Sequence, residues 1–514
     1  MDVLLNWALR GAYITIGAGA GLWILRWLQV NWRSSSERWT VRIAAVTLLL
    51  AGVYTIAHVR LLVQRSAIEE GREIYAVFGD PRRTEMRRAE VRGWMLDCTA
   101  REDGALAYYR ERDGVVERTY PLGEAGANLI GGGEGPETRD YTIEILFADE
   151  LRRPGTFMEL GALHPAGEDL AVTLCRNVTA EAYEQLARVG RPGAVVVQDA
   201  SNGAVLAYAA TGGPEEPPLG IKRYSPPGSV FKLALSALWW ESGMPDDISI
   251  PCPAEIEVTS RATISNFGNI GRGMVEGPAG MLIPSCNTAA VWMAQRLREE
   301  VGSEAFVEAY RRWGFEPYEE IPPRDSIGDF WRTRSDAWTR RMTPAPSRLR
   351  ISGRTGDAEW AQLSIGQGPL DVTVVGVSRF VQSIANDGVM LPPTIELDLA
   401  LDSPRGQRVM RASTAEKLQE AMLQVVERGT GRGAGAIMQG TGWQIGGKTG
   451  TAQLAGRADN GWFASIVFDP EGEPRYTVVT LVVGGGGGSG AAATIAGRVA
   501  RELVREPPVL GGAE

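Results

Sequence analysis

The chain has 514 residues, which suits two or three domains of about 150 residues each. Apolar residues make up 44% of the sequence and charged residues 22%, a balance typical of globular proteins rather than disordered or fibrous ones. The net charge of −9 excludes the broad basic surface that favours nucleic acid, so we expect no nucleic-acid partner.

Two apolar segments near the N-terminus predict a membrane anchor. Residues 43–59 carry no charge and would span about 26 Å as a helix, close to the hydrocarbon core of about 30 Å. Residues 11–25 form a second uncharged run, and arginines surround the link between the two. Because positive residues mark cytoplasmic loops, we expect the chain after residue 60 to lie outside the cytoplasmic membrane. The alternative for either run is a buried core helix.

Later segments predict an α+β fold. Residues 105–121 alternate as strands do, within a small strand-rich module. Residues 194–211 form two apolar strands around an Asp-Ala-Ser-Asn-Gly turn, which predicts a hairpin. Strands at both ends of the following segment, with helices between them, predict one antiparallel sheet with helices packed on it. The remaining predicted elements are helices at 230–241, 287–298, 371–385 and 491–504 and strands at 462–468 and 476–483.

Histidine, cysteine and lysine are the informative residue types. The two histidines, His58 and His164, leave almost no material for a Ser-His-Asp or Cys-His catalytic system. The four cysteines form no CxxC or Cys/His cluster, so we predict no metal site and no cofactor, and they leave the redox compartment open. Lysine, unlike arginine, can lose its proton and act as a base. The four lysines are Lys222, Lys232, Lys417 and Lys448.

Ser229 and Lys232 stand three residues apart at the predicted start of an apolar helix. This spacing places both side chains on one face, one turn apart. The N-terminus of a helix also favours developing negative charge. The pair therefore predicts a serine nucleophile with an adjacent base and no histidine. The alternative is an N-cap serine followed by a solvated lysine.

Two further short motifs follow. Ser-Cys-Asn at 285–287 precedes a predicted helix, where serine and asparagine are also ordinary N-cap residues. Lys-Thr-Gly-Thr at 448–451 precedes the apolar strand at 462–468. Residues 442–449 also fit the phosphate-loop pattern GxxxxGK[ST], which needs a buried strand before it and a helix after it. The flanking sequence favours neither, so a nucleotide-binding ATPase is a weak alternative.

Taken in order, SxxK, SxN and KTG resemble the motifs of the penicillin-binding serine D,D-transpeptidase superfamily. Several longer segments look like the monofunctional class B penicillin-binding proteins: YSPPGSVFK at 224–232, SCNTA at 285–289, LSIGQG at 363–368, SIANDG at 383–388 and GGKTGTA at 446–452. RGWMLD at 92–97 and YPLGEAGANLIG at 120–131 resemble a shortened pedestal of that class, although Cys98-Thr99-Ala100 replaces the usual Arg-Asn-Gly.

The resemblance implies four parts. These are a membrane anchor at 1–64, a shortened pedestal at 65–165, a transpeptidase domain at 166–506 and a tail at 507–514. It also implies a peptidoglycan D,D-transpeptidase that cross-links stem peptides and is inhibited by β-lactams. The implied partners are D-Ala-D-Ala stem peptides, β-lactam antibiotics and a polytopic glycan polymerase in the membrane.

The resemblance also assigns roles to residues. Ser229 would attack the terminal D-Ala-D-Ala amide, and Lys232 would take the serine proton. Ser285 would relay a proton towards the leaving amine, while Lys448 would meet the substrate carboxylate. The implied substrate-binding residues are Asn287, Thr449, Gly450 and Thr451, and the backbone N–H groups of Ser229 and Thr451 would form an oxyanion hole.

Three related activities stay open or are disfavoured. A D,D-carboxypeptidase would share the acyl-enzyme, and a non-catalytic β-lactam-binding sensor or scaffold would share the binding site. A class A β-lactamase would need a glutamate in an ExxxN loop between SxN and KTG. The one ExxxN pattern, Glu124 to Asn128, lies before the nucleophile, which disfavours hydrolysis of this kind.

Overall fold

The computed structural model describes Arg26 and most of the chain from residue 93 onward. The described ranges are 93–112, 115–131, 142–147, 151, 169–212, 220–221, 225–315, 347–351, 354–402, 406–453 and 456–511. All of these ranges belong to one compact unit, residues 91–153 and 166–514. Within them and Arg26, no helix is long and apolar enough to cross a bilayer. The two predicted spans, 11–25 and 43–59, and the predicted boundary at 165 lie outside the described residues.

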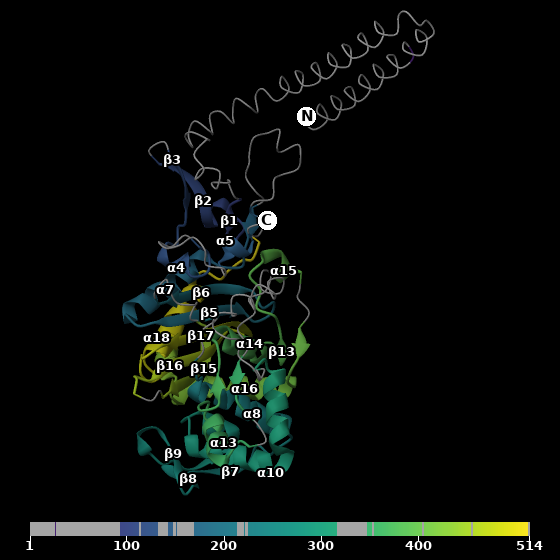
Figure 1. The fold of residues 1–514 in the computed structure, drawn as a ribbon, viewed down its shortest axis with the longest axis vertical. Coiled ribbons are helices and arrows are strands. Elements are labelled where there is room, and N and C mark those ends of the chain that lie inside the picture. Colours follow the sequence, from purple (N-terminus) through teal and green to yellow (C-terminus); the bar gives the residue numbers. More distant parts are fainter. Residues whose placement is uncertain are drawn as a thin grey trace, which may run out of the picture. The chain divides into compact units, whose positions relative to one another are not determined.

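A five-stranded antiparallel sheet with strand order β15-β16-β17-β5-β6 lies at the centre of the unit (Figure 1). The hairpin predicted at 194–211 is confirmed, and the sheet places it beside strands from the end of the chain. The strands are β5 (Gly193–Asp199), β6 (Val205–Thr211), β15 (Gln444–Ala452), β16 (Asn460–Phe468) and β17 (Pro474–Val482).

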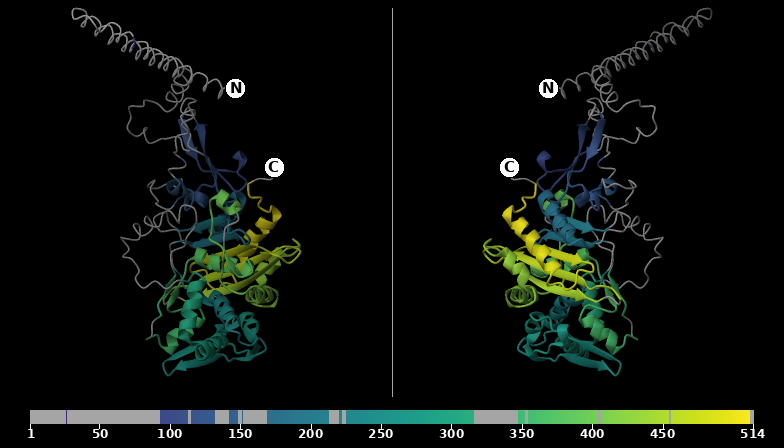
Figure 2. Two further views of the ribbon diagram at one scale, coloured as in Figure 1. Left: turned by 90° about the vertical axis from the view of Figure 1, so that its right-hand side faces the viewer. Right: turned by 90° about the vertical axis from the view of Figure 1, so that its left-hand side faces the viewer.

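Helices cover both faces of this sheet (Figure 2). Alternate residues of β16 belong to different cores: Trp462 belongs to the core that includes α14 and α16, whereas Phe463 belongs to the core that includes α7 and α18. Every residue of β16 is therefore buried, which explains the continuous apolar run in its sequence. The helices are α7 (Arg176–Val189), α17 (Arg432–Met438) and α18 (Ala491–Arg505) on one face, and α14 (Val374–Ala385) and α16 (Ala412–Arg428) on the other.

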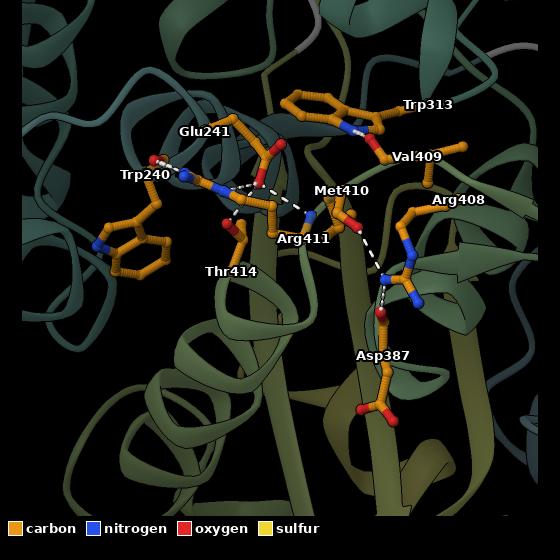
Figure 3. A network of polar contacts seen from close by, with 9 residues as sticks. All are labelled: Trp240, Glu241, Trp313, Asp387, Arg408, Val409, Met410, Arg411 and Thr414. Atoms are coloured by element: carbon orange, nitrogen blue, oxygen red, sulfur yellow. Dashed lines mark hydrogen bonds and ion pairs between the residues drawn. The ribbon is translucent and has the colours of Figure 1, made fainter.

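A second group of elements carries the SxxK and SxN motifs. Helix α8 is buried along nearly its whole length, and its last residue, Glu241, is fixed to the start of α16. Glu241 accepts hydrogen bonds from the backbone N of Arg411 at 3.0 Å and from the hydroxyl of Thr414 (Figure 3). The elements are η4 (Gly228–Phe231), α8 (Lys232–Glu241), α9 (Gly277–Leu282), α10 (Asn287–Arg312), α13 (Asp357–Ser364), β7 (Ser249–Cys252) paired with β10 (Gly273–Glu276), and β8 (Glu255–Thr259) paired with β9 (Ala262–Ser265).

The N-terminal module is a small sheet of order β3-β2-β1-β4, which confirms the strands predicted at 105–121. The disulfide Cys98–Cys175 joins it to the start of α7. Its elements are β1 (Met95–Leu96), β2 (Ala105–Arg112), β3 (Val115–Thr119), α4 (Glu124–Ala127), α5 (Ile143–Leu146) and β4 (Leu170–Ala171). Elsewhere lie the pairs β11 (Arg348–Leu349) with β12 (Leu370–Asp371) and β13 (Val389–Met390) with β14 (Gln407–Arg408), and α15 (Leu397–Leu401).

Candidate active site

The structure brings the three predicted motifs together from distant parts of the chain. Ser229 lies in the turn η4, and Lys232 is the first residue of α8. Ser285 lies in the turn between α9 and α10, and Lys448 lies in the middle of β15. Ser229 precedes the α-helix in a 3₁₀ turn rather than opening it, but the backbone N–H of Lys232 still bonds to the carbonyl of Ser229.

Two glycines allow the turn that carries Ser229 to lie directly against β15. A Cβ atom on Gly450 would sit 2.7 Å from the carbonyl oxygen of Pro227. A Cβ atom on Gly228, whose φ is +54°, would sit 2.5 Å from the carbonyl oxygen of Thr451. Only glycine tolerates both the backbone conformation and the close approach. The glycine of the KTG motif therefore serves the packing of the nucleophile's turn.

The side chains of Lys232 and Lys448 converge on the hydroxyl of Ser285. The distance from Nζ to Ser285 Oγ is 2.8 Å for Lys448 and 3.3 Å for Lys232. Both lysines are fully buried. Burial, and after it the charge of Lys448, holds the pKa of Lys232 well below its ordinary value. Burial lowers the pKa of Lys448 to about 7.

The partners of Lys232 fit a neutral amine. Its Nζ lies 2.7 Å from both the carbonyl oxygen of Ser285 and Oδ1 of Asn287, which can only accept. These two acceptors use the two N–H groups of a neutral amine and leave its lone pair free to accept a proton. Lys448 in turn donates to the same hydroxyl. The hydroxyl of Ser285 therefore links the two buried lysines.

Ser285 adopts a left-handed backbone conformation with φ +59°. For a residue with a Cβ atom, such a conformation costs about 1–3 kcal/mol and persists only where the surroundings impose it. Backbone hydrogen bonds on both sides contribute: Ser285 N donates to Leu282 O at 3.1 Å, and Cys286 N donates to Met281 O at 3.0 Å. The disulfide Cys252–Cys286 ties the next residue to β7. The turn at Ser285 is thus held by contacts outside itself.

The predicted substrate-binding residues surround this centre. Asn287 places Oδ1 at Lys232, and its Nδ2 donates to the carbonyl oxygen of Ser265 at 2.8 Å. Thr449 is buried, and its hydroxyl is 2.6 Å from that of Thr430. Thr451 is half-buried and is therefore the more accessible of the two threonines.

The phosphate-loop alternative is wrong. The segment that matches GxxxxGK[ST] does not form a loop between a strand and a helix, because most of it is strand β15 itself. The next element is another strand, β16, which pairs with β15 along nine residue positions. A phosphate cradle needs a free loop at a helix N-terminus, so this segment cannot form one.

Several residues that shape the site have no local signature in the sequence. Asn460 Nδ2 donates to Ser225 Oγ at 2.8 Å, and Trp462 Nε1 donates to the carbonyl oxygen of Pro226 at 2.9 Å. Both contacts fix the segment before Ser229 to β16, across 235 and 236 residues of sequence. The two cysteine pairs were likewise not predicted. Among the described residues, no cluster of histidine, cysteine or acidic side chains could hold a metal ion.

The family described as the penicillin binding protein transpeptidase domain matches residues 193–505, more than half of the chain. The chain therefore belongs to this family. Curated relatives include the penicillin-binding protein PbpB of Mycolicibacterium smegmatis, 28% identical over 418 residues, and the probable peptidoglycan D,D-transpeptidase PenA of Neisseria meningitidis, 25% identical over 409 residues. These matches cover 70% and 71% of this chain but 60% and 64% of the relatives. The chain thus spans less than two thirds of their length.

Solved structures share the fold. The D,D-transpeptidase domain of a peptidoglycan glycosyltransferase from Eggerthella lenta is 25% identical, with a TM-score of 0.63, and the match covers 81% of this chain and 99% of that one. Penicillin-binding protein A from M. tuberculosis, in an imipenem acyl-enzyme complex, has the same TM-score at 22% identity, over 80% of this chain and 98% of that one. The resemblance to penicillin-binding proteins that the three motifs predicted is confirmed, as is the α+β fold.

Proposed function

We propose that the chain is a peptidoglycan D,D-transpeptidase, which cross-links stem peptides through a serine acyl-enzyme and is inhibited by β-lactams. The observation that carries this proposal is the convergence of Lys232 and Lys448 on Ser285, next to the turn that holds Ser229. Membership of the transpeptidase domain family and the similarity to PenA support it.

In the proposed reaction, Ser229 Oγ attacks the carbonyl carbon between the two terminal D-alanines, and neutral Lys232 takes the hydroxyl proton. The C–N bond breaks while the leaving D-alanine amine receives a proton through Ser285. The amine of a neighbouring stem peptide then attacks the ester carbonyl and forms the cross-link. The C–O bond to Ser229 breaks, and the proton that the amine gives up returns to Ser229 Oγ. Charged Lys448 holds the terminal carboxylate of the donor by a charge-assisted hydrogen bond.

Strand β15 is the edge of the central sheet, so one side of its backbone has no neighbouring strand among the described residues. We assign the extended donor peptide to this edge, where it would be added as a further strand. Because Thr449 is bonded to Thr430, the accessible Thr451 is the better partner for the substrate carboxylate beside Lys448. The backbone N–H groups of Ser229 and Thr451 are assigned to the oxyanion.

The proposal includes a place for the enzyme: anchored in the cytoplasmic membrane, with the described unit outside, beside a polytopic glycan polymerase. Two disulfides within that unit support an oxidising compartment. Arginines between the two N-terminal apolar runs support the orientation. A reporter that is active only outside the cytoplasm should be active when fused at Glu514. The same reporter inserted at Ser35 should indicate a cytoplasmic position. The reverse pattern would contradict this placement.

Covalent labelling tests the chemistry. Incubation with a fluorescent penicillin, followed by intact-mass measurement, should show one adduct on the wild type and none on Ser229→Ala. An adduct that persists on the alanine variant would overturn the assignment of the nucleophile. With stem-peptide donor and an acceptor amine, cross-linked dimer is the expected product. Release of D-alanine without dimer would indicate a D,D-carboxypeptidase, and labelling without turnover would indicate a sensor.

A further inference from the structure

Asn266 lies just after β9. It links the segments next to the strand pairs β7–β10 and β8–β9 to the turn that carries Ser285. Its side chain is almost completely buried. Oδ1 accepts hydrogen bonds from the backbone N atoms of Asn287 at 2.8 Å and Thr288 at 3.2 Å, which open α10. The first N–H groups of a helix have no partner within the helix. Asn266 therefore caps α10 from a separate segment of the chain.

The other end of the same amide is anchored. Nδ2 donates to the carbonyl oxygens of Pro253 at 2.7 Å and Ile270 at 3.0 Å. The backbone N of Asn266 donates to Ala254 O at 2.9 Å. Both acceptor positions and both donor hydrogens of the side chain are thus engaged. The orientation of the amide is fixed, and with it the position of the helix start that it caps.

The residues next to this cap carry the proposed proton transfer. Ser285 precedes the capped residues and keeps a positive φ that its neighbours must impose. We propose that Asn266 is a positioning residue for acyl transfer, which holds Ser285 against the two buried lysines by capping α10. The inference rests on the proposed transpeptidase function, because it assigns Asn266 a role through Ser285 rather than contact with substrate.

A double-mutant cycle tests the inference by penicillin acylation of the full chain, with the acylation rate constant separated from initial binding. Asn266→Ala should lower the rate constant about 10- to 100-fold and leave initial binding nearly unchanged. A misplacement of a reacting group by about 1 Å is enough for a loss of this size. In the Ser285→Ala background, Asn266→Ala should lower the acylation rate constant less than about twofold. The hydroxyl through which Asn266 acts has then already been removed. Asn266→Ser keeps a shorter acceptor and should show a smaller loss with the same dependence on Ser285.

Gln382 provides the matched control. It is a fully buried amide whose Nε2 donates to Ala200 O at 2.7 Å and whose Oε1 accepts from Leu391 N at 2.9 Å. Gln382→Ala should lower the melting temperature but leave the acylation rate constant unchanged. Equal losses in Gln382→Ala and Asn266→Ala, or full additivity with Ser285→Ala, would overturn the positioning role. Wild-type rates in both Asn266 variants would do the same. A wild type that is not labelled at Ser229 would instead refute the proposed function.

Discussion

The two sides of the candidate site are held in place by different means. Lys448 lies in β15, which pairs with β16 over nine consecutive positions, so its place follows from regular strand geometry. Ser285 lies in a turn at positive φ, and its place depends on the disulfide Cys252–Cys286 and on the amide of Asn266. One side is built from a continuous ladder of backbone hydrogen bonds, and the other from two backbone hydrogen bonds and a few side-chain contacts.

This difference has a consequence for catalysis. Many strand hydrogen bonds share the positioning of Lys448, so no single substitution outside β15 should displace it far. The turn at Ser285 has few supporting contacts, so loss of one of them should lower the acylation rate. Substitutions at the chemical groups themselves should still have the largest effects, followed by changes in the supports of the turn and then by changes distant from both.

The largest effect is expected at Lys232. Lys232→Arg should lower the acylation rate about 10²- to 10⁴-fold, nearly as much as Lys232→Ala, because arginine stays charged and cannot accept the proton of Ser229. Rapid mixing with a chromogenic β-lactam measures the rate. Acylation by the arginine variant within a few-fold of the wild type would show that Lys232 is not the base.

Loss of the strand lysine should have a smaller effect. Lys448→Ala removes one charge-assisted contact to the substrate carboxylate, worth about 1.5–3 kcal/mol, or roughly 10- to 150-fold in acylation rate. The same rapid-mixing assay compares the variant with Lys232→Ala in parallel. Both variants should fold, as judged by their melting temperatures. A Lys448→Ala rate equal to that of the wild type would contradict the carboxylate role.

The acylation efficiency should follow a bell-shaped pH profile. The acid limb arises as Lys232, whose pKa is held low by burial and by Lys448, becomes neutral and able to accept a proton. The alkaline limb arises because Lys448, whose pKa burial lowers to about 7, loses its charge as the pH rises. Above that pKa the efficiency should fall by up to about tenfold per pH unit, until it reaches the level of Lys448→Ala. Lys448→Arg should move the alkaline limb to higher pH, since arginine keeps its charge. An alkaline limb unmoved by this change would exclude Lys448 as its source.

Local patterns predicted the chemical groups of the site better than the contacts that hold them in place. The apolar run of β16 and the periodicity of α8 are visible in sequence, and so are the motifs that contain Ser229 and Lys448. The pairing of four cysteines is not, since four cysteines allow three pairings. Asn266 caps α10 across 21 residues, and no local pattern marks such a contact. The predicted helix at 287–298 ends only a few residues early, because the backbone leaves helical geometry at Gly302 before helical residues resume and run to Arg312.

The disulfide beside the SxN motif should have a moderate effect on activity. Replacing Cys252 and Cys286 together by alanine removes one support of the turn but leaves the bonds from Asn266 to Asn287 and Thr288. The acylation rate should therefore fall several-fold, less than in Lys448→Ala. Treatment of the wild type with a reductant should give the same change, and treatment of the double variant should give none. An unchanged rate in the double variant would mean that the other contacts suffice to hold Ser285.

The second disulfide provides the contrasting case and the smallest expected change in activity. Cys98–Cys175 joins the N-terminal module to the start of α7, on the face of the sheet opposite α14 and α16. Replacing both cysteines by alanine should lower the free energy of unfolding by about 2–4 kcal/mol, the usual range for loss of a native disulfide. The acylation rate of the folded variant should match that of the wild type, because β15 and the turn at Ser285 keep all their contacts. Denaturant unfolding and acylation kinetics on the same preparation measure both quantities. A loss of acylation as large as that from removing Cys252–Cys286 would show that the N-terminal module also positions the catalytic groups, and that the site is not held locally.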